Sequence, residues 1–409
     1  MKLRTLPRSQ QGNPPQRSVQ LDALDWVAII VFLIGVGCVG SGALSSSDAS
    51  STALRVTPLL LFLGAVIVFA ELLAKSGVFS AIAVRIARAA GGRYPLLFLF
   101  CVAFATLTTI FLNLDTTAVL LTPIMLATAR RIDAPGMPLA MTTVWLANTA
   151  SLLLPVSNLT NLLGIGRVGL STEAFAARMI VPQLVALTLT ACFLWIFHWR
   201  TAVGDAHRYR VPEPHRPRDI WIFRLGAGCT VAFVLLILVG APLYVASLSV
   251  AGVMVVAVAV RRPYWLAWCM IPWRLLLFVT GLFLVIQTVS QLGLGHLLAA
   301  AVGSEDGATG TARAAGIGAL LANLVNNLPS YIAVEQAIPA GHDNQLFGLL
   351  FGTNIGPLIT PWASLAILLW HERCRAAGVT IQWRKFMATG AVTATITLAA
   401  TVTTYILVG

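Results

Sequence analysis

The stretch Phe111-Leu112-Asn113-Leu114-Asp115-Thr116-Thr117 separates two apolar runs, Tyr94 to Phe111 and Ala118 to Ala129. In one arrangement both arms span a bilayer and place the polar residues at its outer surface. In the other, both arms enter from the cytoplasm as a re-entrant hairpin whose tip is buried near the midplane. Non-helical backbone is tolerated at that depth only where protein or a water-filled cavity covers it. The basic pair Arg130 and Arg131 follows the second arm, and we predict the re-entrant hairpin.

A second polar stretch, Asn323-Leu324-Val325-Asn326-Asn327-Leu328-Pro329, interrupts an apolar segment in the same way. Two other apolar segments are broken, at Pro155 to Asn161 and at Gly352 to Pro357. The order of segments therefore repeats: two spans, an interfacial helix, a hairpin, a broken span and a further span, with opposite polarity in the second half. Inverted repeats with discontinuous helices are typical of secondary transporters with a midplane site. The predicted fold class is an all-α polytopic membrane protein with two inverted repeats, each containing a re-entrant hairpin and a broken transmembrane helix.

Composition agrees with a membrane protein. Of the 409 residues, 58% are hydrophobic and only 10% are charged, and apolar runs of spanning length recur, as from Leu235 to Val260. The net charge of +12 comes from Lys and Arg in short clusters between apolar runs, which follows the positive-inside rule and argues against a nucleic-acid partner. Six scattered cysteines without a CxxC pair argue against a disulfide framework or a metal site. No nucleotide-binding motif is present, so we do not expect ATP-driven transport by this chain alone. We expect neither an enzyme nor a bound cofactor.

The charge pattern also predicts the organisation of the chain. We expect a multi-pass protein of the plasma membrane whose N-terminus is cytoplasmic. The predicted parts are a disordered cytoplasmic tail (1–22), a first transmembrane repeat (23–198), a basic cytoplasmic linker (199–219), a connecting span (220–240) and a second, inverted transmembrane repeat (241–409). In this topology only four of 27 basic residues, Arg55, Arg167, Arg178 and Arg313, lie outside. The Ser/Ala-rich stretch Ser41 to Leu54 is predicted to be an outside loop.

The polar clusters are the candidate binding site. An unwound segment exposes backbone amides and carbonyls, Asn adds a donor and an acceptor, and the ends of half-helices contribute partial charges. A helix cap in an ordinary loop explains any one cluster equally well, but four in corresponding positions favour a site. The candidate substrate- and ion-binding residues are Asn113, Asp115, Thr116, Thr117, Ser157, Asn158, Thr160, Asn161, Asn323, Asn326, Asn327, Thr353, Asn354 and Thr360.

Asp115 stands apart because acidic residues at hydrophobic depth are energetically costly and usually functional. It is the candidate proton carrier, although Asp-Thr-Thr is also good N-cap chemistry and both roles are compatible. We expect Asn113 and Asn323 to be equivalent anchors of the two hairpins, which leaves Val325 at the position that matches Asp115. Glu335, on the second hairpin, is interpreted as a charge at a helix end or in an outer vestibule.

The motifs resemble those of the ArsB-type arsenite/antimonite efflux permeases. These permeases belong to the wider ion-transporter superfamily, which includes dicarboxylate/sodium symporters. The resemblance covers roughly Leu59 to Trp370. The motifs that carry it are Phe111-Leu112-Asn113-Leu114-Asp115-Thr116-Thr117 with Leu121-Thr122-Pro123, Ser157-Asn158-Leu159-Thr160-Asn161, Asn326-Asn327-Leu328-Pro329, and Gly352-Thr353-Asn354-Ile355-Gly356-Pro357-Leu358-Ile359-Thr360-Pro361.

The resemblance implies a scaffold and a moving transport part, with substrate held by hairpin tips and broken spans. It also implies extrusion of arsenite or antimonite, driven by a proton gradient or the membrane potential, alone or with a cytoplasmic ATPase subunit; a homodimer in the lipid bilayer is expected. The chain departs from the pattern at two places. Asn-Leu-Asp-Thr-Thr stands where such permeases often have Asn-Asp-Gly, and Pro361-Trp362-Ala363 replaces a more usual Pro-Ile-Gly.

Two other functions stay open. The first is a sodium-coupled symporter for di- or tricarboxylates, which normally needs a cationic or donor-rich pocket. The absence of Arg and Lys near the tips favours a neutral solute such as arsenous acid, with Asp115 as the proton carrier. The second is a membrane scaffold or receptor that transports nothing, in which the buried polar breaks would have no purpose.

Overall fold

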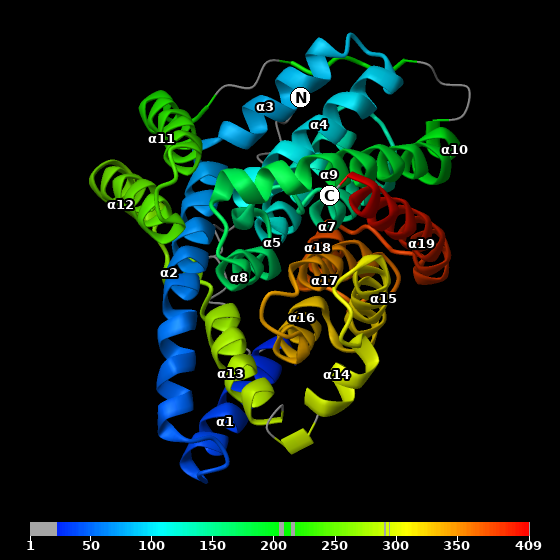
Figure 1. Cartoon of the computed structure of the whole chain (residues 1–409). Helices are drawn as coiled ribbons and strands as arrows, with labels where there is room; N and C mark the ends of the chain where they lie inside the picture. The colour runs from blue at the N-terminus through cyan, green and yellow to red at the C-terminus, as the bar shows by residue number, and fades with distance from the viewer. Residues whose placement is uncertain (1–22, 204–207, 214–216, 290–291, 294, 409) are drawn as a thin grey trace, which may run out of the picture.

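A computed structural model describes residues 23–203, 208–213, 217–289, 292–293 and 295–408. The predicted tail, 1–22, lies outside the described residues. Throughout the described ranges the chain is helical, without a β-strand beyond one isolated bridge between Arg93 and Arg208. The predicted all-α fold class is therefore confirmed (Figure 1).

The helices before residue 204 include the first predicted hairpin and the first broken span, and their bounds follow the apolar runs. They are α1 (Ala23–Gly40), α2 (Ser46–Ser76), α3 (Val78–Ala89), α4 (Tyr94–Leu112), α5 (Leu114–Thr116), the π-helical turn η1 (Thr117–Leu121), α6 (Thr122–Arg131), α7 (Gly136–Thr149), the 3₁₀ turn η2 (Pro155–Ser157), α8 (Leu159–Val168), α9 (Thr172–Leu194), the π-helical η3 (Trp195–Trp199) and α10 (Arg200–Val203).

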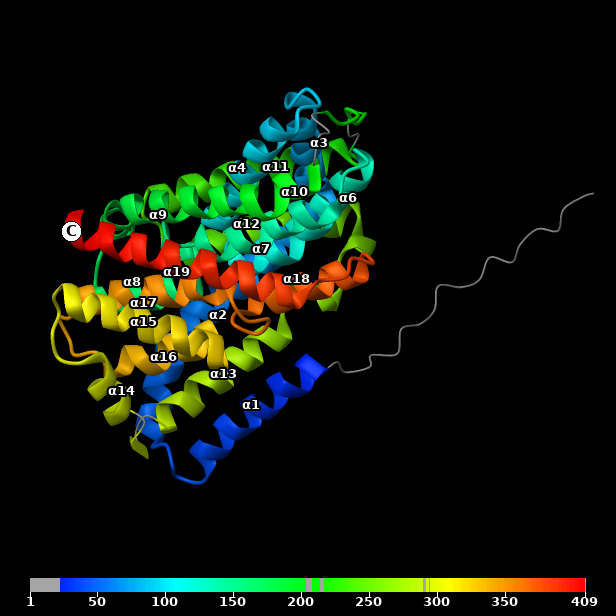
Figure 2. The same cartoon turned by 90° about the vertical axis from the view of Figure 1, so that its right-hand side faces the viewer.

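The helices after residue 219 follow a similar order. They are α11 (Ile220–Leu238), α12 (Leu243–Arg261), the 3₁₀ turns η4 (Pro263–Trp265) and η5 (Trp268–Met270), α13 (Trp273–Val289), α14 (Gly295–Val302), α15 (Ala308–Val325), α16 (Asn327–Ala337), α17 (Asp343–Ile355), the 3₁₀ turn η7 (Gly356–Leu358), α18 (Leu365–Ala376) and α19 (Trp383–Val408). Neighbouring α9 and α19, and α15 and α17, run side by side (Figure 2).

Six helical segments among the described residues are long and apolar enough to cross a membrane. They are Ser46–Ser76, Tyr94–Leu112, Thr172–Ala202, Ile220–Ile237, Leu243–Arg261 and Trp383–Val408. With the two shorter apolar helices, Trp26–Gly40 and Trp273–Val289, they describe a multi-pass transmembrane protein. The direction in which the chain crosses the membrane stays a prediction.

The predicted loop from Ser41 to Leu54 is wrong over most of its length. Helix α2 begins at Ser46, because Ser45 caps it: its hydroxyl accepts a bond from the Asp48 backbone N–H at 3.1 Å. Ser and Asp in a first turn satisfy free amides at a helix start. The Ser-rich stretch from Ser46 to Leu54 therefore belongs to the first turns of α2 and not to a loop.

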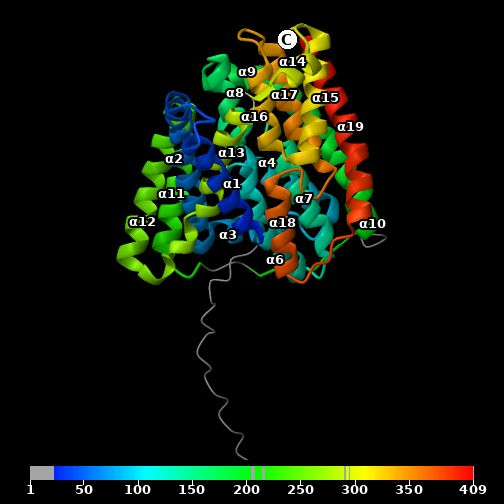
Figure 3. The same ribbon diagram turned by 90° about the horizontal axis from the view of Figure 1, so that it is seen from below.

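One group of helices, α1, α2 and α11 to α13, lies on one side of the molecule, where α13 contacts α16 of the second hairpin and α2 contacts η1 of the first (Figures 1 and 3). Within it α1 packs closely on α13, since a Cβ added at Gly35 would lie 2.8 Å from the Gly281 carbonyl oxygen. A Cβ at Gly281 would overlap the backbone of Phe32. Small residues permit this contact, as is usual between membrane helices.

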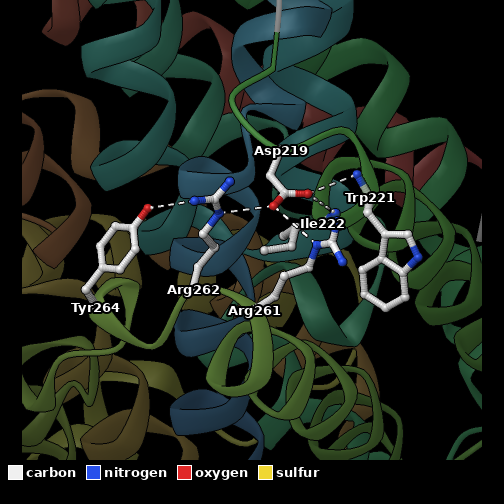
Figure 4. A network of polar contacts seen from close by, with 6 residues as sticks. All are labelled: Asp219, Trp221, Ile222, Arg261, Arg262 and Tyr264. Atoms are coloured by element: carbon white, nitrogen blue, oxygen red, sulfur yellow. Dashed lines mark hydrogen bonds and ion pairs between the residues drawn. The ribbon is translucent and has the colours of Figure 1, made fainter.

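A buried carboxylate joins the ends of α11 and α12 (Figure 4). Asp219 Oδ1 accepts bonds from the backbone N–H groups of Trp221 and Ile222 at 3.1 and 3.2 Å. Its Oδ2 lies 3.4 Å from Arg261 Nε and 3.1 Å from Arg262 Nε. Burial acts to raise the pKa of Asp219, but the Ile222 N–H and the two arginines outweigh it, so the pKa lies below its usual value.

Both predicted hairpins form as a helix, a tight tip and a second helix. The first joins α4 to α5, η1 and α6; the second joins α15 to α16. The first tip is buried, Asn113 being 3% exposed, as the re-entrant arrangement requires. Helix α6 lies near one end of the molecule and α14, which precedes the second hairpin, near the other (Figure 3). The inverted relation of the two halves and the domain bounds stay predictions.

Candidate functional site

The first tip is an asparagine-capped turn. Asn113 adopts φ 87° and ψ 166°, a conformation that few residues other than glycine tolerate. Its side-chain Oδ1 accepts a bond from the Thr116 N–H at 2.8 Å, and its carbonyl accepts one from the Thr117 hydroxyl at 2.8 Å. The π-helical turn η1 follows at once, and such turns often mark functional segments.

The second tip repeats this turn around Asn326. Asn326 adopts φ 122° and ψ 154°, its Oδ1 accepts from the Leu328 N–H at 3.4 Å, and its carbonyl accepts from the Ser330 hydroxyl at 2.6 Å. Asn326, and not Asn323, is therefore the structural counterpart of Asn113, and the position that matches Asp115 is Leu328. The expected pairing was wrong because three asparagines lie close together in sequence and only the backbone conformation identifies the capping one.

Asn354 joins the two broken spans. It is 1% exposed, on the last turn of α17. Its Oδ1 accepts bonds from the Ser151 hydroxyl at 2.9 Å and from Asn158 Nδ2. Its Nδ2 donates to Asn161 Oδ1 at 3.1 Å and lies 3.4 Å from the Thr160 hydroxyl. Five candidate or neighbouring polar side chains from residues 151–161 and 354 thus meet at one point.

The unwound carbonyls of the first break are satisfied internally. Asn161 Nδ2 donates to the Ser151 carbonyl at 2.6 Å and lies 3.2 Å from the Leu152 carbonyl. From the neighbouring α9, Gln183 Nε2 donates to the Thr149 carbonyl at 3.0 Å and its Oε1 accepts from the Leu152 N–H at 3.0 Å. Sequence analysis missed Gln183, because a lone Gln inside an apolar span gives no sign of its partner.

The second break is tied to the second tip. Thr360 N–H donates to Asn323 Oδ1 at 3.0 Å, and Asn323 Nδ2 donates to the Gly356 carbonyl at 2.9 Å. The Asn327 N–H donates to the Ala363 carbonyl at 2.8 Å. These bonds place Asn323, Asn327 and Thr360 between the hairpin and the broken span.

The remaining candidates are buried and bonded within their own elements or to a neighbour. Thr353 donates from its hydroxyl to the Leu349 carbonyl at 2.9 Å. Ser157 donates to the Ile110 carbonyl at 2.9 Å, which links the first break to the first hairpin. Asn158 also caps α8, its Oδ1 accepting from the Thr160 N–H at 3.2 Å.

Three buried oxygen atoms on the first hairpin and on α7 lack a hydrogen-bond partner among the described residues. They are Asp115 Oδ1, Thr116 Oγ1 and Asn148 Oδ1. Helices α5 and η1, which follow the tip, pack against α7, which ends one residue after Asn148. Buried polar atoms are normally satisfied, so unsatisfied ones indicate a place for a ligand or water.

Asn148 is a further candidate site residue, which sequence analysis missed. Its Nδ2 donates to the Val144 carbonyl at 2.9 Å, just as Asn354 Nδ2 donates to the Leu350 carbonyl at 2.8 Å. Both residues lie at the end of the first segment of a broken span. The sequence does contain a sign of its role, because the spacing from Asn148 to Pro155 equals the spacing from Asn354 to Pro361.

The charges around the site are few. No Lys or Arg occurs in 94–129, 136–166 or 314–372. Among the described residues no group of three His, Cys, Asp or Glu could hold a metal ion. Glu335 lies in the last turn of α16, in agreement with the interpretation as a charge at a helix end, and it is buried, with an exposure of 1%.

Comparison with known proteins identifies similar sequences and a similar fold. The family described as Citrate transporter (CitMHS) matches residues 21–346. An arsenical pump membrane protein of Escherichia coli (strain K12) is 27% identical over 350 residues, covering 80% of either chain. A putative arsenical pump membrane protein of Bacillus subtilis (strain 168) is 25% identical over 410 residues, covering 88% of this chain and 90% of that protein. The YdaH transporter of Alcanivorax borkumensis shares the fold, with a TM-score of 0.59 at 13% identity over 94% of this chain and 97% of its own.

Proposed function

The chain belongs to the citrate transporter family of membrane transporters, and we propose that it extrudes arsenite or antimonite. The arsenical pump membrane proteins that it resembles over most of its length support this choice of substrate. The driving force in this proposal is the proton gradient or the membrane potential.

One observation carries the choice of substrate: the segments that form the site contain no Lys or Arg. A di- or tricarboxylate buried there would keep its negative charges without a counter-charge, which is strongly unfavourable. Arsenous acid is uncharged at neutral pH and carries hydroxyl donors. The buried acceptor atoms Asp115 Oδ1 and Asn148 Oδ1 suit such a solute.

Asp115 is the proposed proton carrier. It lies two residues after the capping residue Asn113, among buried side chains, and no basic residue is near it in sequence. A carboxylate in such surroundings is neutral when protonated and costly when charged. Binding a proton on one side and releasing it on the other would therefore change the charge of the moving tip once per cycle.

A sodium-coupled di- or tricarboxylate symporter is the second candidate. The description of the matched family, Citrate transporter, favours it. In that function, the amide and hydroxyl donors of the two breaks would have to hold the carboxylates.

The wider arrangement in this proposal is a plasma-membrane protein with a cytoplasmic N-terminus and two inverted repeats. Short basic clusters such as Arg130 and Arg131 support that orientation. A homodimer and a cytoplasmic ATPase subunit complete the proposal by analogy with arsenite permeases.

Transport into everted membrane vesicles tests the substrate. Vesicles containing the protein should accumulate arsenite when a proton gradient is imposed, whereas vesicles without it should not. Citrate and succinate, with sodium and proton gradients, form the other arms. Sodium-dependent uptake of citrate or succinate, with arsenite inert, would replace the leading proposal by the second.

A further inference from the structure

The break between α15 and α16 leaves one carbonyl without its helical partner. In a continuous helix the Asn323 carbonyl would accept from the Asn327 N–H, but that N–H donates to the Ala363 carbonyl instead. Free carbonyls at the end of a half-helix in a transporter are potential cation ligands. What occupies this carbonyl therefore bears on ion selectivity.

Two side chains from the second break occupy it. Trp362 Nε1 donates to the Asn323 carbonyl at 2.8 Å, and the Thr360 hydroxyl donates to it at 3.0 Å. The Trp362 carbonyl in turn accepts from Asn326 Nδ2 at 2.9 Å. A carbonyl has two lone pairs: Trp362 Nε1 occupies one, and the Thr360 hydroxyl shares its single proton between the other and Asn323 Oδ1, which lies 3.2 Å away.

The first half lacks these side chains. At the spacing set by Pro155 and Pro361, Val156 stands in place of Trp362 and Leu154 in place of Thr360. The corresponding carbonyl, of Ile110, accepts one side-chain bond, from Ser157.

The first half instead keeps the open acceptors. Asp115 Oδ1, Thr116 Oγ1 and Asn148 Oδ1 are buried, and no described residue donates to them. At the tips themselves a carboxylate occurs only in the first half, since Leu328 takes the place of Asp115 at the second tip.

We propose that Trp362, with Thr360, closes the second tip to cations by occupying the Asn323 carbonyl, so that the coupling ion binds at the first tip only. That the bound ion is coupled to transport rests on the proposed function. The closure of the second tip is a property of the folded protein and does not depend on it. Trp362 is in this view a positioning residue that sets ion selectivity. Trp362 is 49% exposed, so replacing its ring leaves no large buried void.

The test compares sodium with choline as chloride salts at equal ionic strength, by thermal unfolding of the purified protein. Sodium should leave the Tm of the wild type unchanged. The variants Trp362→Phe and Thr360→Val, alone and combined, free one or both lone pairs of the carbonyl. We expect the double variant to gain a sodium-dependent rise in Tm of about 2 °C, because a ligand that binds only the native state stabilises it. Trp268→Phe, at a residue that is 83% exposed, is the matched control.

Arsenite flux in proteoliposomes adds a functional readout. The double variant should acquire sodium dependence that the wild type and Trp268→Phe lack. A double variant that folds and stays indifferent to sodium would overturn the inference. So would a sodium-dependent Tm in the wild type that survives Asp115→Asn and Thr116→Val. If the wild type carries no arsenite at all, the proposed function fails, while the sodium-dependent Tm of the variants still decides the closure.

Discussion

Replacing Asp115 by Asn tests the coupling mechanism directly. The change removes the titratable proton and keeps the size of the side chain. Because no partner in the described residues bonds to Asp115 Oδ1, the substitution breaks no hydrogen bond at that atom. It also removes the cost of a buried charge. The variant should therefore fold, with a Tm at or above that of the wild type.

The effect on transport follows from the energy of a pH gradient. One pH unit corresponds to about 1.36 kcal/mol per proton, or a tenfold concentration ratio. If one proton moves per arsenite, a gradient of about two units supports roughly hundredfold accumulation. Without a titratable group the gradient is uncoupled, so Asp115→Asn should equilibrate arsenite to a ratio near unity.

Proteoliposomes with an imposed pH gradient and arsenic measured by elemental analysis give both quantities. Counterflow exchange at zero gradient should persist in Asp115→Asn, since it needs no net proton movement. Asp133→Asn is the matched control: Asp133 lies on an exposed turn between α6 and α7, with φ 53°, which Asn also tolerates. Driven accumulation that remains near the wild-type ratio in Asp115→Asn would remove the residue from coupling. Loss of counterflow as well would make it a binding or structural residue instead.

Three other predictions concern the framework around the site. Asn354→Leu leaves the buried Asn158 amide and Asn161 Oδ1 without this partner. The free energy of unfolding, measured by denaturation in mild detergent, should fall by about 3 kcal/mol. An unchanged denaturation midpoint would contradict the role of Asn354 in joining the two broken spans. Gly281→Val should cost about 3 kcal/mol, because its Cβ overlaps the α1 backbone, and an unaltered Tm would show that α1 does not pack there. Asp219 has a lowered pKa, so its contribution is complete above the ordinary carboxyl value of 3.8 and is lost as the pH falls through the lowered pKa. The Tm difference between wild type and Asp219→Asn should accordingly be constant from neutral pH to about pH 5 and shrink in stronger acid; a difference that grows on acidification would refute the assigned sign.

Much of the fold was predictable because its signals are local. Polar and helix-breaking residues inside apolar runs located the tip at Asn113 and the breaks at Pro155 and Gly356, and length alone predicted the spans. The start of α2 was mispredicted because its Ser-rich composition is typical of a loop, whereas the sign of a helix start is a single capping residue, Ser45.

The site was less predictable because its bonds join distant parts of the chain. Asn148 and Gln183 each look like an isolated polar residue in an apolar helix, and only the packing of α7 against α9 gives Gln183 its role. The assignment of Asn323 as an anchor failed for the same reason. Its partners, Thr360 and Trp362, follow it by more than thirty positions.

The position of Asn354 has an evolutionary consequence. One amide in the second half serves Ser151, Asn158 and Asn161 in the first. A change at any of these positions removes a partner from the others, so single substitutions should be purged and viable ones should occur as concerted sets. The two halves of the chain would in this way lose their freedom to diverge independently at their point of contact.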